Sequence, residues 1–182
     1  MGNDPVNNVD LWGLWGSDVH FDDTLKWANE IFNDENKAQI IAKADNDVDS
    51  GFTNPVFGDQ SWHFNTNNFS FTYYLFNESS SGTSEDSRVE HSNKQMEIAA
   101  LLYNIGLEDE SFRELGKGLH ALQDLYAHDD KYVGYMFIVE RWAHLGGDAD
   151  NKKINSTGYD KTILATNNYL EQYQTRIENK NK

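Results

Sequence analysis

The chain has 182 residues, which is the size of a single domain with a substantial core. Acidic residues outnumber basic ones by 30 to 15, so the formal net charge is −15 and the composition provides no basic surface for duplex nucleic acid. The absence of cysteine excludes disulfides and thiolate metal sites, and no apolar run is long enough to span a membrane. Any metal ion must therefore be held by histidine and carboxylate side chains.

The hydrophobic periodicity predicts an all-α fold, a compact multi-helix domain with long loops. Asp22 or Asp23 is placed to cap the first helix, and Gly106 is placed to end the third. Residues 50–68 form a predicted loop, and the aromatic segment 69–76 is compatible with either a short strand or a buried segment. The predicted helices cover residues 23–33, 36–48, 88–105, 109–129, 131–145 and 159–179.

The most informative helix contains His120, Asp124 and His128 at positions i, i+4 and i+8. These positions drift by only about 80° around a helix, so all three side chains point to one side. Leu115 and Leu119 fall on a neighbouring face that can pack against the core. Eight residues of helix span about 12 Å, which is too far for His120 and His128 to bind the same ion. The spacing therefore predicts a chain of metal ions, with Asp124 able to bridge two of them.

The other candidate ligands near the end of the chain are His144 and Asp148. They are four residues apart where two glycines break a predicted helix, so Asp148 can turn back toward the ion of His128. Glu140 lies one helical turn before His144 and is an alternative to Asp148.

Two further candidates, Asp49 and His63, flank a long predicted loop that can bring both ends to one site. Asp45 and Asp47 are alternatives to Asp49 in the same acidic run. His20 lies just before the first predicted helix and completes the candidate set. The sixth histidine, His91, is expected to be a surface residue.

The order of these ligands resembles that of the zinc-dependent phospholipase C and single-strand nuclease superfamily. The resemblance implies an all-α fold, up to three zinc ions and hydrolysis of phosphodiesters. In the nuclease branch an N-terminal tryptophan binds zinc through its amino group and carbonyl, and a histidine follows five residues later. Trp15 and His20 have this spacing (20 − 15 = 5).

The resemblance assigns each zinc ion a set of ligands. The chemistry of such a cluster also makes Asp49 a candidate general base toward a water that bridges two ions. One departure concerns the central motif, in which three residues separate Asp124 from His128 where both enzyme branches have five. This tighter form resembles a broader group of the superfamily, so the geometry around His128 and the substrate stay open. The implied sets are Asp49, His63, His120 and Asp124; the Trp15 amino terminus, His20 and Asp124; and His128, His144 and Asp148.

The first 14 residues carry a second resemblance. The run Gly-Asn-Asp-Pro-Val-Asn-Asn-Val-Asp-Leu-Trp-Gly-Leu resembles the end of the Rhs-repeat core, with Leu11 where that family usually has proline. In that family a protease built into the Rhs shell cuts after the final leucine. The resemblance implies a cut between Leu14 and Trp15 and release of residues 15–182 as a toxin. The cut would expose Trp15, the residue that the zinc superfamily has at its N-terminus.

Together these features predict a zinc phospholipase C-like toxin that is secreted or delivered into a target cell and acts on membrane phospholipid. The acidic composition favours this interpretation, and the toxin context implies a cognate immunity protein in the producing cell. The alternative is a nuclease acting on single-stranded nucleic acid, which the spacing of Trp15 and His20 favours. A third possibility is an inactive domain in which metals only stabilise the fold.

Overall fold

The computed structural model describes residues 15–49, 62–63, 86–128, 152–153 and 155–179. No strand occurs in these ranges, and the predicted all-α fold is confirmed. The described elements are the π-helix η1 (Asp18–Asp23) and the α-helices α1 (Thr24–Phe32), α2 (Glu35–Asp47), α4 (Ser87–Asn104), α5 (Glu108–His128) and α6 (Ser156–Glu178).

Five of the predicted helices fall in the described ranges, and their predicted ends differ from the observed ones by three residues or fewer. The helix predicted over 131–145 and the aromatic segment 69–76 lie outside the described residues. Among the helices that are described, none is both long and apolar enough to cross a bilayer.

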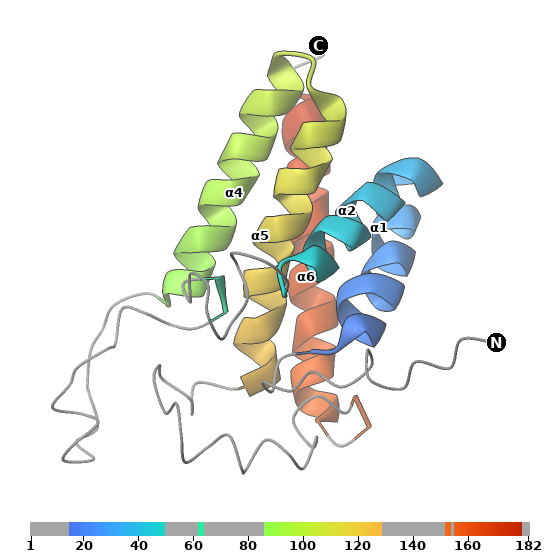
Figure 1. The fold of residues 1–182 in the computed structure, drawn as a ribbon, viewed down its shortest axis with the longest axis vertical. Coiled ribbons are helices and arrows are strands. Elements are labelled where there is room, and N and C mark those ends of the chain that lie inside the picture. The colour runs from blue at the N-terminus through green and yellow to red at the C-terminus, as the bar shows by residue number, and fades with distance from the viewer. Residues whose placement is uncertain (1–14, 50–61, 64–85, 129–151, 154, 180–182) are drawn as a thin grey trace, which may run out of the picture.

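Helix α5 is the central element of the fold. It contacts α2, α4 and α6, and Figure 1 shows α4 and α5 side by side, with α6 behind them and α1 and α2 on the opposite flank of α5. The main core lies between these helices, and it includes the predicted packing residues Leu115 and Leu119. Its largest fully buried members also include Ile41, Phe112, Leu170 and Tyr173.

Two glycines let α5 approach its neighbours closely. A Cβ at Gly116 would collide with the Ile41 carbonyl of α2, and one at Gly118 would collide with the Tyr169 hydroxyl of α6. The contact with α4 includes a polar bond beside its apolar packing, in which the Ser92 hydroxyl donates to the Gly118 carbonyl at 2.7 Å. These contacts fix the position of α5, and with it the histidine and aspartate that follow Gly118.

The turn between α1 and α2 is formed by an asparagine and an aspartate. Asn33 ends α1 in the left-handed conformation (φ 49°), which asparagine adopts more readily than most residues. Asp34 then caps α2 by accepting from the main-chain N–H groups of Asn36 and Lys37. This turn sets α2 beside α1 and directs its C-terminal end toward the middle of α5.

The predicted cap of the first helix is wrong. Asp23 stands at the N-cap of α1 but makes no side-chain cap bond, because η1 runs directly into α1 and Asp23 itself has a helical conformation. Its carboxylate instead accepts from Lys152 Nζ at 2.6 Å and from the Tyr159 hydroxyl at 2.8 Å. Asp23 therefore ties the first helical segment to the beginning of α6.

Candidate metal centre

Histidine and aspartate side chains from separate parts of the chain meet beside the C-terminal half of α5. Five of the six side chains are fully buried, and the carboxylate of Asp49 is 32% exposed. The cluster consists of His20 from η1, Asp45 from α2, Asp49 just after α2, His63, and His120 and Asp124 from α5.

The two α5 residues meet because they are one helical turn apart. His120 Nε2 lies 3.1 Å from Asp124 Oδ2, as the i, i+4 spacing predicts. His20 stacks on the His120 ring with centroids 4.2 Å apart, and His63 stands perpendicular to it at 4.8 Å. Three imidazoles are thus in direct contact, in an interior where neutral apolar side chains would ordinarily pack.

Asp124 contacts different histidines through its two oxygens. Oδ1 lies 3.4 Å from His20 Nε2. Oδ2 lies 3.1 Å from both His63 Nδ1 and His120 Nε2. A carboxylate in this position can ligate one ion through each oxygen, as the sequence analysis expected of Asp124.

Two groups of side chains have ligand atoms close enough together to hold a metal ion. One consists of His20, Asp45 and His120, and the other consists of Asp49, His63 and His120. All ligand atoms within each group lie within 4.8 Å of one another. Histidine nitrogen and carboxylate oxygen together form a donor set that suits zinc and several other divalent metals.

The hydrogen bonding of the cluster also fits a cation. His20 Nε2 and Asp124 Oδ1 are buried atoms that make no hydrogen bond within the described part of the chain. Buried polar atoms of folded proteins nearly always have a partner, and an ion accounts for those that do not. A cation between the two atoms would satisfy both.

The electrostatics of the cluster are dominated by the pairing of imidazoles with carboxylates. Burial and the adjacent His120 lower the pKa of His20, but Asp45 and Asp124 raise it more, and the resulting pKa is about 10. Burial also lowers the pKa of His120, and Asp124 and Asp49 raise it well above the ordinary value. A bound cation must therefore displace protons from these two rings.

The pKa of the Asp124 carboxyl is shifted in the opposite direction to those of His20 and His120. Burial raises its pKa, but the neighbouring His120, His20 and His63 outweigh this effect and lower its pKa well below the ordinary value. Asp124 is therefore a carboxylate at neutral pH, which is the form that ligates metals.

The acidic run at the end of α2 supplies two residues to the cluster. Asp45 Oδ1 lies 3.0 Å from His20 Nδ1 and 3.3 Å from His120 Nδ1. Asp49 Oδ1 lies 3.4 Å from His120 Nε2 and 3.8 Å from His63 Nδ1, so the structure brings Asp49 and His63 together as expected. Asp47 points elsewhere, because its exposed carboxylate pairs with Lys43. Asp45, which the sequence analysis treated as an alternative to Asp49, belongs to the cluster together with it.

Comparisons with known proteins give no identification. No family model, no curated protein and no solved structure matches the chain. The interpretation of the centre therefore depends on its own geometry and on the resemblances carried by the sequence.

The predicted third ion lies outside the described residues. His144, Asp148 and the alternative Glu140 are not among them, and His128 is described only as the last residue of α5. The ligand set of His128, His144 and Asp148 stays a prediction.

Trp15 is held one turn before His20. Its side chain is fully buried, and its indole Nε1 donates to Thr162 Oγ1 of α6 at 2.9 Å. The Gly16 carbonyl accepts from the main-chain N–H groups of Val19 and His20, so the chain between Trp15 and His20 forms a helical turn rather than an extended segment. The Trp15 amine as a zinc ligand stays a prediction, and this helical turn is compatible with it.

Buried polar residues that were not predicted from the sequence support the cluster. Gln123 is fully buried beside Asp124, and its Oε1 lies 2.8 Å from His20 Nδ1. Thr24 donates to Asp45 Oδ2 at 2.9 Å. Both residues could have been proposed from the sequence. Gln123 lies three residues after His120 and Thr24 lies four after His20, so each shares a helical face with a candidate ligand.

Arg88 is a second kind of support for α5. Its buried guanidinium pairs with Asp86 and donates from Nη1 to the Asp124 carbonyl at 3.3 Å. The start of α4 is thereby attached to the main chain of a cluster residue.

His91 was expected at the surface, but its ring is only partly exposed. It packs edge-on against Trp62, with centroids 4.1 Å apart. Trp62 is half-buried and directly precedes His63, so this aromatic pair lies in the chain next to a candidate ligand.

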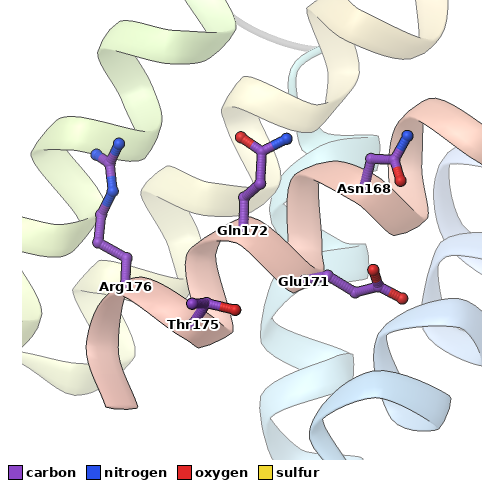
Figure 2. Close-up of a pocket in the computed structure, with 5 residues that line it drawn as sticks. All are labelled: Asn168, Glu171, Gln172, Thr175 and Arg176. Atoms are coloured by element: carbon purple, nitrogen blue, oxygen red, sulfur yellow. The ribbon is translucent and has the colours of Figure 1, made fainter. Parts of the chain in front are cut away.

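A separate hollow of about 500 Å³ lies along α6. Figure 2 shows its lining side chains projecting from this single helix. They are Asn168, Glu171, Gln172, Thr175 and Arg176. None of them belongs to the histidine and aspartate cluster, so this hollow is not part of the candidate metal centre.

Proposed function

We propose that the chain is a zinc-dependent phosphodiester hydrolase whose centre is the cluster of His20, His63 and His120 with their aspartates. The observation that carries this proposal is the placement of Asp124, whose Oδ1 faces His20 and whose Oδ2 faces His63 and His120. Two-metal phosphodiester hydrolases hold their ions about 3.5–4 Å apart, a separation that one carboxylate can bridge. Asp124 is placed to be such a shared ligand.

Bound zinc would supply Lewis acidity and lower the pKa of a coordinated water toward neutrality. The chain contributes Asp49, the one carboxylate of the cluster with access to solvent. Burial raises the pKa of Asp49, but His120 and His20 lower it by a larger amount. This carboxyl is therefore ionised and can accept a proton from water. Its low pKa makes it a weak base, so Asp49 serves chiefly to orient the water and hold an ion.

We place the activity in the phospholipase C class, with membrane phospholipid as the substrate. The excess of 30 acidic over 15 basic residues favours this class over enzymes that bind a polyanionic strand. A single-strand nuclease is the second candidate. It is favoured by the five-residue spacing of Trp15 and His20 and by Trp62, a half-buried aromatic beside His63 on which a base can stack.

The biological setting that we propose is that of a toxin released from an Rhs-repeat protein. It rests on the resemblance of residues 1–14, which lie outside the described part of the chain. Cleavage between Leu14 and Trp15 would free the Trp15 amine close in sequence to His20. We infer that the cut completes the ligands of the His20 ion and activates the enzyme, and that an immunity protein protects the producing cell.

The activity is tested with protein starting at Trp15, loaded with zinc chloride. The substrates are phosphatidylcholine vesicles, with release of phosphocholine as the readout, and a single-stranded DNA oligonucleotide. Hydrolysis that is abolished by a chelator, restored by zinc and lost in His120→Ala supports the proposal. Hydrolysis of the oligonucleotide alone would replace the lipase by the nuclease, and no hydrolysis of either substrate by the zinc-loaded protein would contradict both.

The role of the cut is tested separately by comparing protein that starts at Met1 with protein that starts at Trp15. We expect the shorter protein to bind more zinc and to turn over substrate faster. Equal zinc content and equal turnover would contradict activation by cleavage, and would leave the hydrolase proposal intact.

A further inference from the structure

We propose that Gln123 is a positioning residue that makes His20 bind its ion through Nε2 rather than Nδ1. The inference rests on the proposed metal centre and concerns the geometry of one of its ligands. His20 has two possible modes of binding. Nδ1 would join Asp45 and His120 around one ion, whereas Nε2 would share an ion with Asp124 Oδ1.

The Gln123 amide is oriented by two hydroxyl groups. Its Nε2 donates to Thr24 Oγ1 at 2.9 Å and to Thr166 Oγ1 at 3.2 Å. Thr24 lies 2.9 Å from Asp45 Oδ2, to which it donates its own hydrogen, so its oxygen is left to accept from Gln123. Both amide hydrogens are thereby used, and the Gln123 oxygen is the atom that faces His20. All of these side chains are fully buried, so water does not compete with this arrangement.

The oriented amide determines which His20 nitrogen carries hydrogen. Gln123 Oε1 accepts only, and it lies 2.8 Å from His20 Nδ1. Nδ1 must therefore be the donor, and Asp45 Oδ1 at 3.0 Å reinforces this arrangement. In the neutral ring Nε2 then carries the lone pair, which is the form that binds a metal.

The surroundings of His20 Nε2 agree with this assignment. It lies 3.4 Å from Asp124 Oδ1, and neither atom has a hydrogen-bond partner in the described chain. In the neutral ring, with the hydrogen on Nδ1, these are two acceptors that face each other in a buried space. A proton on Nε2 removes this conflict in the metal-free protein, and a cation that displaces that proton removes it in the loaded protein. The Gln123 bond fixes the ring in the orientation that the cation requires.

The test is a zinc titration of three variants, each in the full chain and in protein that starts at Trp15, combined with nitrogen NMR of the His20 ring in the zinc-loaded protein. Gln123→Met keeps the size of the side chain and removes the acceptor, whereas Gln123→Glu keeps an acceptor oxygen. Gln39→Met, at an exposed position of α2, is the matched control. Loss of a ligand-supporting bond typically lowers metal affinity about 10–100-fold. We expect that loss in Gln123→Met, a smaller loss in Gln123→Glu, which keeps the acceptor oxygen but lacks the two orienting amide bonds, and no change in the control.

The NMR and a double variant separate positioning from general damage to the fold. We expect Nδ1 to carry hydrogen in the wild type and in Gln123→Glu, and a mixture of the two forms in Gln123→Met. In a His20→Ala background, Gln123→Met should cause no further loss of zinc affinity. If Gln123→Met does not fold, Thr166→Val supplies the test, because it removes one of the two hydroxyls that orient Gln123 and should weaken zinc binding in the same direction.

The possible failures are distinguishable. Wild-type protein that binds no zinc would contradict the metal centre itself. The role of Gln123 alone would be contradicted by a different outcome. In that case the wild type binds zinc, and Gln123→Met or the folded Thr166→Val binds it equally well through the same nitrogen.

Discussion

The pairing of His20 and His120 with carboxylates makes a quantitative prediction about pH. With a pKa of about 10, His20 is protonated at neutral pH, and a zinc ion must displace that proton to bind. At pH 7 the displacement spans about 3 pH units (10 − 7), which opposes binding by about 4 kcal/mol. The apparent zinc association constant should therefore rise about tenfold per pH unit for each displaced proton, and the His20 proton alone should contribute about 100-fold between pH 7 and 9.

His120, whose pKa is also raised, adds a second displaced proton when its ion binds. The measurement is calorimetric titration of chelator-stripped protein with zinc chloride in two buffers of different ionisation enthalpy, which counts released protons. The His20→Ala variant should release one proton fewer than the wild type. Zinc affinity that does not change with pH, without proton release, would refute this account of the cluster.

The raised pKa values of His20 and His120 also affect the folding stability of the metal-free protein. This stability should fall as the pH rises, whereas zinc affinity should increase. A histidine whose pKa is raised by folding stabilises the fold below its unfolded value near 6.5, and this contribution is lost as the pH rises through the folded value. Stripped protein should therefore lose stability between about pH 7 and 10, while zinc-loaded protein should not. Denaturant unfolding at several pH values measures both, and parallel curves for the two forms would contradict the prediction.

Three further substitutions test the remaining parts of the account. Gly118→Ala should lower the free energy of unfolding by about 1–3 kcal/mol, because its Cβ would collide with the Tyr169 hydroxyl; an unchanged melting temperature would show that α5 has room to shift. Phe112→Ala should cost about 3–5 kcal/mol by opening a cavity in the fully buried core, and a loss below 1 kcal/mol in denaturant unfolding would mean that the core is not packed as described. Asp49→Asn should reduce phosphodiester hydrolysis about 100-fold or more with little effect on folding. The control Asp47→Asn should leave the rate unchanged, because the Asp47 carboxylate pairs with Lys43 outside the cluster. Equal rates in both variants would show that Asp49 is not part of the site.

Much of the fold was predictable because the helices follow local rules. Apolar spacing gave helix bounds within three residues, and the i, i+4 relation of His120 and Asp124 gave their contact directly. The helix cap that was wrongly predicted at Asp23 shows the limit of such rules. A neighbouring π-helix removed the position that a capping side chain needs, and the contacts of Asp23 with Lys152 and Tyr159 come from residues more than 120 positions away.

Asp45, Asp47 and Asp49 were treated as alternatives, although helical spacing distinguishes them. Asp45 and Asp49 are four residues apart and share one helical face, whereas Asp47 lies about 200° around the axis from Asp45. Spacing therefore separates the pair from Asp47, but only the packing of α2 against α5 shows that this face meets the histidines. The support from Gln123 depends equally on packing, since its partners lie on three different helical segments.

The most direct test of the central claim is the zinc content of protein that starts at Trp15 compared with its Asp124→Asn variant, by plasma mass spectrometry. Because Asp124 faces His20 through one oxygen and His63 and His120 through the other, removing its charge should weaken two ions at once. We predict about two or three zinc ions per wild-type chain and a loss of about two in the variant, with helical content retained in circular dichroism. Wild-type protein without zinc, or a folded variant that keeps all of its zinc, would contradict the proposal of a shared carboxylate in a zinc cluster.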